Sequence, residues 1–190
     1  MSSIADDPPE PREPAAIAQF TIRAARVADY EGIAALQALP GYRAGTLRTP
    51  FQSPEGTRKF LETQAPGNLM IVAVLEERIV GMAGLERYVG RRAHVASFGM
   101  GVHDDHRRQG IGAGLLDALI DAADNWFTVR RLELTVFVDN VAAIKLYERA
   151  GFEREGVLRM YALRDGAYVD AYQMARLSPE PGRITVGTAT

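Results

Sequence analysis

No cysteine occurs among the 190 residues of the chain. Its absence excludes a disulfide framework, a thiolate metal site and a cysteine nucleophile, so an acyl-cysteine intermediate is excluded as well. Histidine is scarce, with three residues. Two of them, His103 and His106, flank a pair of aspartates, and this segment is expected to be an exposed turn. A metal site needs ligands that converge on one point. We therefore expect no bound metal.

Long apolar runs and an excess of basic residues are missing too. The longest apolar run, Leu69–Leu75, is far too short to cross a bilayer. The proline-rich, acidic start of the chain lacks the basic residues and apolar centre of a secretory signal. A net charge of −2 and a pI near 6.0 argue against a nucleic-acid partner, which requires a basic face. We expect a cytoplasmic protein that binds neither membranes nor nucleic acid.

The chain is long enough to bury a substantial core and short enough to form one domain. Residues 1–18 are predicted to be a disordered extension, and residues 178–190 lack a periodic apolar face and are predicted to be a flexible tail. The sequence therefore places a single domain at 19–177.

Two common phosphate-binding motifs are absent, because the chain contains neither a G-x-x-x-x-G-K-[ST] loop nor a G-x-G-x-x-G turn. It has instead R-x-x-G-x-G, from Arg107 to Gly112, between a strand-like run ending at Val102 and an amphipathic helix beginning near Ile111. Such glycines permit a tight turn and close approach of the backbone, and a helix start offers unpaired N–H groups. The pattern predicts a pyrophosphate site, although read alone it is equally typical of an ordinary strand-to-helix connection.

Hydrophobic periodicity predicts the order strand, two helices, three strands, helix, strand, helix, two strands. The three consecutive strands are separated by turn residues, which fits an antiparallel meander best. The helices are predicted to begin near Asp29, Glu55, Ile111 and Asn140. The predicted strands are Phe20–Ala24, Leu69–Leu75, Ile79–Tyr88, His94–Val102, 132–138, Phe152–Leu163 and Tyr168–Leu177.

Several local features of these elements can be predicted as well. Segment 41–54 is rich in loop-forming residues, and the helix at 55–64 is expected to turn Phe60 and Leu61 inward. The helix from Ile111 has the clearest apolar stripe of the chain, which extends to Trp126. Asn140 is predicted to cap the last helix and Gly151 to close it.

A second motif follows the first along the chain, Asn140-x-x-Ala143-x-x-Leu146-Tyr147-x-x-x-Gly151-Phe152. Together with the glycine motif and the order of elements, it resembles the GCN5-related N-acetyltransferases (GNAT) over roughly 19–177. The resemblance implies an α/β (α+β) GNAT fold, with a mixed central sheet of about seven strands flanked by four helices. It also implies acetyl-CoA as co-substrate and direct attack by an amine in a ternary complex.

The resemblance further implies roles for individual residues. Backbone N–H groups from Arg108 through Ala113 would hold the pyrophosphate, and Asn140 would lie near the pantetheine arm. Tyr147 would protonate the departing sulfur as a general acid, the alternative being a core tyrosine packed beside Leu146. For the side chains of Arg107 and Arg108, the alternative is a solvated surface pair. The candidate cofactor-binding residues are Met100, Gly101, Val102, Arg107, Arg108, Gln109, Gly110, Ile111, Gly112, Ala113, Asn140 and Tyr147.

The general base is not identified by the sequence. Glu86, His94 and Glu133 lie on predicted central strands, and Glu86 and His94 are kept as catalytic candidates beside Tyr147. Some relatives place a carboxylate five residues before the asparagine, a position that Thr135 occupies here. Ordered water is the remaining alternative.

Three further stretches, 124–126, 133–140 and 161–172, resemble bacterial L-amino-acid N-acetyltransferases, which acetylate free amino acids such as phenylalanine and methionine. The expected acceptor is therefore a small-molecule amine. The alternatives are a toxic amino-acid analogue, a ribosomal-protein N-terminus, or a non-catalytic regulatory module that binds coenzyme A. Relatives commonly dimerise through the C-terminal strands, so we also expect a homodimer.

Overall fold

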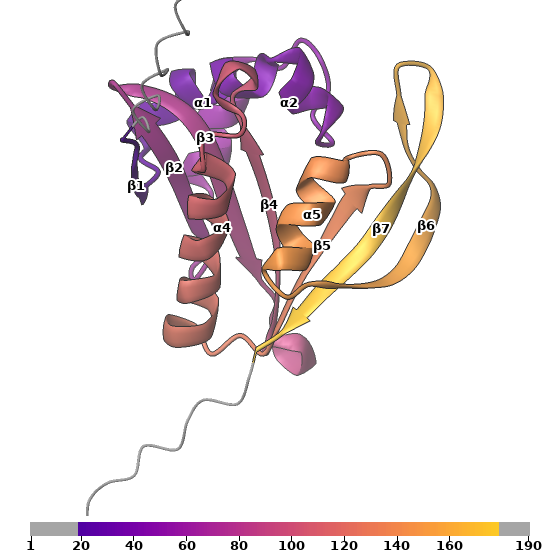
Figure 1. Cartoon of the computed structure of the whole chain (residues 1–190). Coiled ribbons are helices and arrows are strands. Elements are labelled where there is room, and N and C mark those ends of the chain that lie inside the picture. The colour runs from indigo at the N-terminus through magenta and orange to yellow at the C-terminus, as the bar shows by residue number, and fades with distance from the viewer. Residues whose placement is uncertain (1–18, 179–190) are drawn as a thin grey trace, which may run out of the picture.

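The computed structural model describes residues 19–178, so the extension predicted at 1–18 and nearly all of the tail predicted at 178–190 lie outside the described residues. Seven strands form one mixed sheet in the order β1-β2-β3-β4-β5-β7-β6 (Figure 1). The strands are β1 Thr21–Ala24, β2 Leu69–Leu75, β3 Arg78–Arg87, β4 Val95–Val102, β5 Arg131–Phe137, β6 Glu153–Arg164 and β7 Ala167–Leu177. The predicted mixed sheet is confirmed.

Four main helices and one short helix cover the sheet. They are α1 Tyr30–Ala38, α2 Pro40–Ala44, α3 Pro54–Glu62, α4 Ile111–Asp121 and α5 Val141–Arg149. Short 3-10 turns lie at Val27–Asp29, Gly90–Arg92 and Asp104–His106. The antiparallel meander of β2, β3 and β4 is confirmed, and β6 pairs antiparallel with β7.

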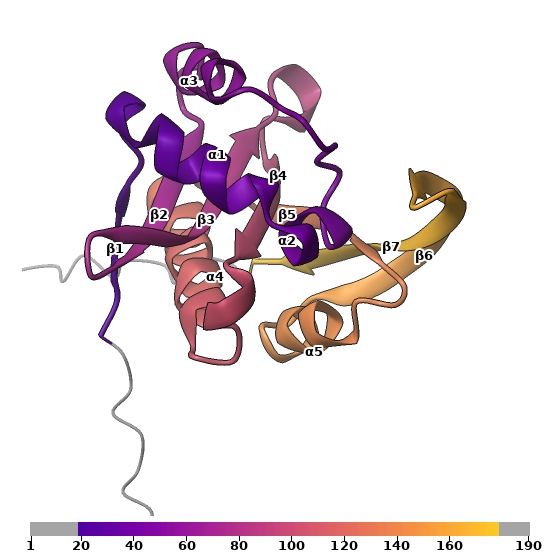
Figure 2. The same cartoon turned by 90° about the horizontal axis from the view of Figure 1, so that it is seen from above.

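The helices divide between the two faces of the sheet, because successive side chains of a strand point to opposite faces. On one face, Ile111 and Leu115 of α4 and Ile144 of α5 pack against the strands in the larger hydrophobic core. On the other face, Ile33 and Leu36 of α1 form a second core with Tyr42, Val72 and Met82. Figure 2 shows α4 and α5 on one side of the sheet and α1 and α3 on the other.

The parallel pairing of β4 with β5 ends early. Only Val95, Ala96 and Ser97 of β4 have partners on β5, namely Arg131, Leu132 and Glu133. Beyond these residues, β4 pairs with β3 alone and β5 with β7 alone, and the two strands diverge (Figure 1). The sheet therefore has an opening between the second halves of β4 and β5.

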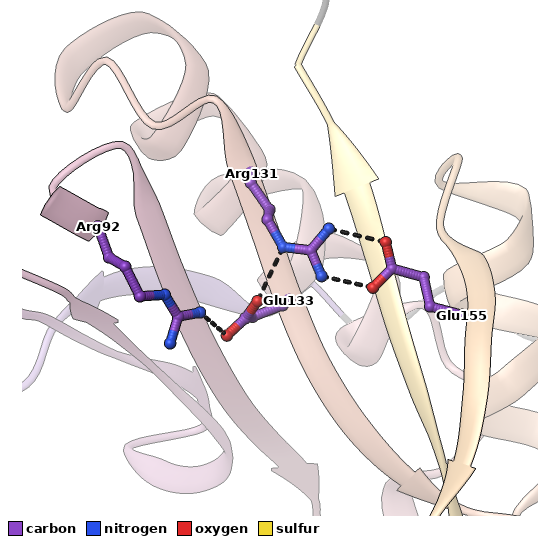
Figure 3. A network of polar contacts seen from close by, with 4 residues as sticks. All are labelled: Arg92, Arg131, Glu133 and Glu155. Atoms are coloured by element: carbon purple, nitrogen blue, oxygen red, sulfur yellow. Dashed lines mark hydrogen bonds and ion pairs between the residues drawn. The ribbon is translucent and has the colours of Figure 1, made fainter.

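A network of ion pairs fixes the closed end of this opening (Figure 3). Glu133 accepts hydrogen bonds from Arg92 Nη2 at 2.6 Å and from Arg131 Nε at 2.9 Å. Arg131 also forms a bidentate ion pair with Glu155, in which Arg131 Nη1 lies 2.7 Å from Glu155 Oε1. Burial alone would raise the pKa of Glu133, but the hydrogen bonds from the two arginines outweigh it and lower the pKa. The network links the 3-10 turn Gly90–Arg92, which precedes β4, to β5 and β6 beside the paired part of β4 and β5.

Because of this network, we expect the stability of the fold to fall at acidic pH. Arg131 hydrogen bonds also lower the pKa of Glu155, and the ordinary value for both carboxyl groups is 4.5. A depressed folded-state pKa adds stability above the unfolded value, and that stability is lost as the pH falls through the folded value. We expect Glu133→Gln to reduce the free energy of unfolding at pH 7 by about 1 to 3 kcal/mol. The test is thermal unfolding from pH 7 to pH 3. The difference in melting temperature between wild type and Glu133→Gln should narrow below pH 4.5. A difference that stays constant over this range would contradict the stabilising role of ionised Glu133.

Segment 41–54 is mostly loop, as predicted, except that Pro40 starts the short helix α2, which buries Tyr42. Two other sequence predictions need correction. Leu61 of α3 packs against the second core as predicted, but Phe60 is 40% exposed, and the buried residue of this helix is Thr57. Helix α4 continues as a π-helical turn at Ala122–Trp126, which shifts the helical phase and leaves Trp126 76% exposed.

Candidate active site

The edge of β4 that faces the opening carries unpaired backbone groups. His103 donates its N–H to Val80 O at 2.8 Å, which fixes the pattern of the β3–β4 ladder. Because backbone groups of successive residues point to opposite edges of a strand, odd-numbered residues of β4 bond to β3. Met100 and Val102 therefore direct their N–H and C=O groups toward the opening. A ligand with amide groups could hydrogen-bond along this edge.

Helix α4 begins at the same end of β4 with a row of free N–H groups. Gly110 is its N-cap residue, at φ +83°, and no side chain caps the helix. The first helical hydrogen bond runs from Gly114 N to Gly110 O, so the N–H groups of Ile111, Gly112 and Ala113 have no acceptor within the helix. A Cβ atom on Gly110 would meet no atom within 4 Å. The turn thus has the open space, the donors and the dipole end that an anion requires.

The two glycines of the motif differ in their backbone. Gly112 lies within α4, and a Cβ atom there would make ordinary contacts of 3.5 to 3.8 Å with Leu146, Val102 and Met100. The residue that shares the left-handed conformation of Gly110 is Arg108, at φ +61°. The tight turn predicted for two glycines is therefore made by Arg108 and Gly110, which corrects the sequence interpretation.

The longer polar side chains of the turn contact their own neighbours. Arg107 Nη2 lies 2.7 Å from Asp104 Oδ1, and the other oxygen of Asp104 accepts the N–H of Gly41 at 2.8 Å. Gln109 Oε1 lies 3.3 Å from His106 Nδ1. Arg107 therefore helps to join the turn to α2, and Arg108 is exposed.

Tyr147 of α5 lies beside the first β4 residue beyond the paired segment. Its ring packs edge-on against Phe98, with centroids 5.8 Å apart, and against Phe152 at 6.0 Å. The side chain is 8% exposed, and burial raises the pKa of its phenol to about 12. Within residues 19–178 the Tyr147 hydroxyl has no hydrogen-bond partner. The only side-chain nitrogen or oxygen in that range that is both fully buried and without a partner is Arg87 Nε, so the Tyr147 hydroxyl is not fully buried. The Tyr147 hydroxyl is therefore an unused donor that keeps access to a ligand.

Asn140 caps α5 as predicted. Its Oδ1 accepts the N–H of Ala143 at 3.3 Å, and Gly151 closes the helix at φ +86°. The amide nitrogen of the side chain lies 3.5 Å from the position that a Cβ atom on Gly45 would occupy. Asn140 thus lies between α5 and the end of α2, on the α5 side of the opening.

A groove of about 640 Å³ lies on the opposite face of the sheet, beside α1, α2 and α3. Its floor lies on β3 and β4, where Gly84 faces Gly99 in register. A Cβ atom on Gly99 would meet no atom within 4 Å, so the floor is open at this point. The groove also reaches Phe98 and Met100, at the edge of β4 that borders the opening. A molecule in the groove can therefore approach a molecule held on the α4 and α5 face.

The residues considered as general base have different surroundings in the structure. Glu86 lines the groove and has no ion pair or side-chain hydrogen bond within the described part of the chain. His94 lies in the turn before β4, one residue outside the strand, and does not line the groove. Glu133 is bound by two arginines in the network described above. Thr135 hydrogen-bonds the Tyr161 hydroxyl at 3.0 Å. Glu86 alone of the proposed carboxylates is both unpaired and within the groove.

Sequence reasoning missed residues that connect distant segments. Tyr42 packs directly on β4, because a Cβ atom on Gly101 would lie only 2.2 Å from the Tyr42 ring. Arg164 of β6 forms an ion pair with Asp139 and donates to Ala44 O at 3.1 Å, so it ties the β6–β7 hairpin to α2. Proline at the first helical position was the available signal for α2. No local pattern indicated the contact of Arg164.

No group of three or more His, Cys, Asp or Glu side chains positioned to hold a metal ion occurs among residues 19–178. None of the helices in that range has the length and apolar character needed to cross a membrane.

The diverging strands, the free helix start and the two-sided access define an acyl-CoA-dependent transferase. The chain belongs to the acetyltransferase (GNAT) family, whose pattern matches residues 36–152, and it is an N-acetyltransferase that uses acetyl-CoA. The residues at the opening fit this donor, because they offer backbone donors for its amides and an open anion site for its diphosphate.

Individual proteins of known sequence or structure are similar to this chain. The L-amino acid N-acetyltransferase AaaT of Escherichia coli is 41% identical over 162 residues, which are 85% of this chain and 99% of that protein. The N-alpha-acetyltransferase RimI of Mycobacterium tuberculosis is 36% identical over 63% of this chain and 73% of its own length. A GNAT-family acetyltransferase from Streptococcus pneumoniae superimposes with a TM-score of 0.75 at 26% identity, covering 85% of this chain and 100% of the other.

Proposed function

We propose that this chain transfers the acetyl group of acetyl-CoA to the α-amino group of a free L-amino acid in a ternary complex. The observation that carries the proposal is the meeting of two surfaces at one opening, the start of α4 on one face and the groove on the other. Substrates held from opposite faces can react directly with each other. The similarity to AaaT over nearly its whole length supports an amino acid as acceptor.

For the donor, we assign the diphosphate to the start of α4 and the amide-bearing arm to the free edge of β4. A helix dipole contributes only about 0.3 to 2 kcal/mol, so direct hydrogen bonds to several N–H groups must supply most of the affinity. We assign Asn140, the cap of α5, to the pantetheine arm and Tyr147, beside Phe98, to the acyl end of this path. The proposed donor-binding residues are Met100, Gly101, Val102, Arg107, Arg108, Gln109, Gly110, Ile111, Gly112, Ala113, Asn140 and Tyr147.

The reaction requires that the nitrogen lose two protons and that the sulfur gain one. The neutral amine attacks the thioester carbon, a C–N bond forms, the C–S bond breaks, and the sulfur departs as a thiolate. We assign Tyr147 as the acid that protonates the sulfur. We assign Glu86 as the group that accepts a proton from the ammonium, directly or through water, because it is the unpaired carboxylate of the groove. The proton that Glu86 takes from the ammonium leaves to solvent. The nitrogen loses a second proton after the C–N bond forms, and this proton balances the one that Tyr147 gives to the sulfur and that Tyr147 regains from solvent.

A screen for release of the coenzyme A thiol tests the proposed function. The chain has no cysteine, so a thiol reagent reports only the product. We expect the highest kcat/KM with apolar free L-amino acids, and lower values with peptides that mimic ribosomal-protein N-termini. Selective acetylation of such peptides, or of a phosphinic amino-acid analogue, would favour those alternatives. Donor binding without thiol release from any acceptor would favour a regulatory module.

We also propose that residues 19–177 form the catalytic domain and that two chains associate through the β6–β7 hairpin. Strand β6 is one of the two edge strands of the sheet, and edge strands offer unpaired backbone groups to another chain. The hairpin exposes six large apolar side chains, namely Val157, Leu158, Met160, Leu163, Tyr168 and Leu177. The mass in solution, measured by light scattering, tests this association.

A further inference from the structure

We propose that Arg48 binds the carboxylate of the acceptor amino acid, while Glu86 receives its amino group. This inference rests on the proposed function and assigns the acceptor a specific chemistry. The acceptor must carry an anionic group beside its amine, and an amine without a carboxylate is a poor substrate.

The charges of the groove match a zwitterion. Of the residues that line it, only Arg48 and Glu86 carry a full charge, and the two charges have opposite sign. They do not form an ion pair with each other, so both remain available to a ligand. Arg48 belongs to the segment after α2, and Glu86 lies on β3 opposite Ser97 of β4. A free α-amino acid carries the complementary pair of charges on one carbon atom.

Arg48 is held in place by neutral groups alone. Its Nη1 lies 3.4 Å from Gln52 Oε1, and its guanidinium carbon lies 5.8 Å from the centre of the Phe60 ring. No carboxylate within residues 19–178 lies within ion-pair distance of this half-buried arginine. Tyr42 and Arg48 both line the groove; burial raises the pKa of Tyr42 to about 12, and the charge of Arg48 opposes that rise. Tyr42 itself packs on Gly101 at the inner end of the groove.

The physical chemistry of this arrangement favours an anion. A guanidinium has five N–H donors in a rigid fork that matches the two oxygens of a carboxylate. Its attraction to an anion is stronger here than in bulk water, because apolar side chains such as Phe60, Met70 and Met82 line the same groove. The same apolar surface can receive the side chain of the acceptor. Other arginines of the chain, such as Arg58, are already paired with carboxylates.

The test compares two acceptors that differ only in the carboxylate. We propose measuring kcat/KM for L-phenylalanine and for 2-phenylethylamine with the wild type, Arg48→Gln and Arg48→Lys. Charge-assisted hydrogen bonds of this kind correspond to roughly 10- to 100-fold in kcat/KM. We expect Arg48→Gln to lose that factor with phenylalanine, mainly through KM, and to keep its activity with phenylethylamine within about 3-fold. Arg48→Lys, which keeps the charge without the fork, should fall between wild type and Arg48→Gln.

Arg58→Gln is the matched control, because it removes one arginine charge from α3, outside the groove lining. It should behave as wild type with both acceptors, and the melting temperatures should show that all variants fold. Equal wild-type activity with phenylalanine and phenylethylamine would overturn the inference while leaving acetyl transfer intact. Equal losses with both acceptors in Arg48→Gln, or no loss, would overturn it as well. A wild type that acetylates no amine at all would instead refute the proposed function.

Discussion

Replacing Tyr147 with phenylalanine is expected to lower kcat about 100-fold while leaving the affinity for acetyl-CoA nearly unchanged. The substitution removes one hydroxyl and keeps the ring that packs against Phe98 and Phe152. That hydroxyl has no partner among residues 19–178, so its loss leaves no buried group unsatisfied. The melting temperature should therefore stay close to that of the wild type.

The raised pKa of Tyr147 is consistent with the proposed acid. A pKa of about 12 keeps the phenol protonated throughout the physiological range. A thiolate formed in the same apolar surroundings is destabilised by the same loss of solvent, which increases its demand for a proton. We therefore expect no loss of activity from ionisation of Tyr147 up to pH 10.

The measurement is steady-state thiol release together with calorimetric titration of acetyl-CoA. Tyr30→Phe serves as the control, because Tyr30 is a tyrosine of α1 whose hydroxyl contacts Glu31. It should have full activity. A Tyr147→Phe enzyme with wild-type kcat would remove Tyr147 from the proposed mechanism, and a variant that lost donor affinity instead would make it a binding residue.

The second large effect is expected from Gly110→Val, which should weaken acetyl-CoA binding by more than about 100-fold. The φ angle of +83° is a conformation that β-branched residues avoid, so the variant either strains or shifts the turn, at a cost of about 1 to 3 kcal/mol. Its side chain would also enter the open space beside the free N–H groups of α4. An anion could then no longer approach those donors.

A matched control separates strain from obstruction. Gly166, in the turn between β6 and β7, has φ +82°, and a Cβ atom there also meets no atom within 4 Å. Gly166→Val should therefore lower the melting temperature by a similar amount and leave donor affinity unchanged. Gly112→Ala should retain stability, because its added Cβ atom makes only ordinary contacts. If calorimetry finds wild-type affinity in Gly110→Val, the start of α4 is not the diphosphate site.

The parts of the fold that could be predicted from sequence depend on neighbours along the chain. The meander was predictable because apolar alternation and turn residues set the strands β2, β3 and β4. The Asn140 cap and the Gly151 closure were predictable because capping acts within one helical turn. Trp126 was misplaced because a π-helical turn changes the helical period, and residue spacing alone does not show such a change.

The sequence by itself determined the family, the order of the elements and the glycine turn that begins α4, since each depends on residues close together in the chain. The tertiary structure alone decided where the pairing of β4 and β5 stops and which acidic residue remains unpaired. It also decided that Arg48 and Glu86 share one groove. These features depend on side chains from distant segments meeting across the sheet, and no local spacing encodes which of them will meet.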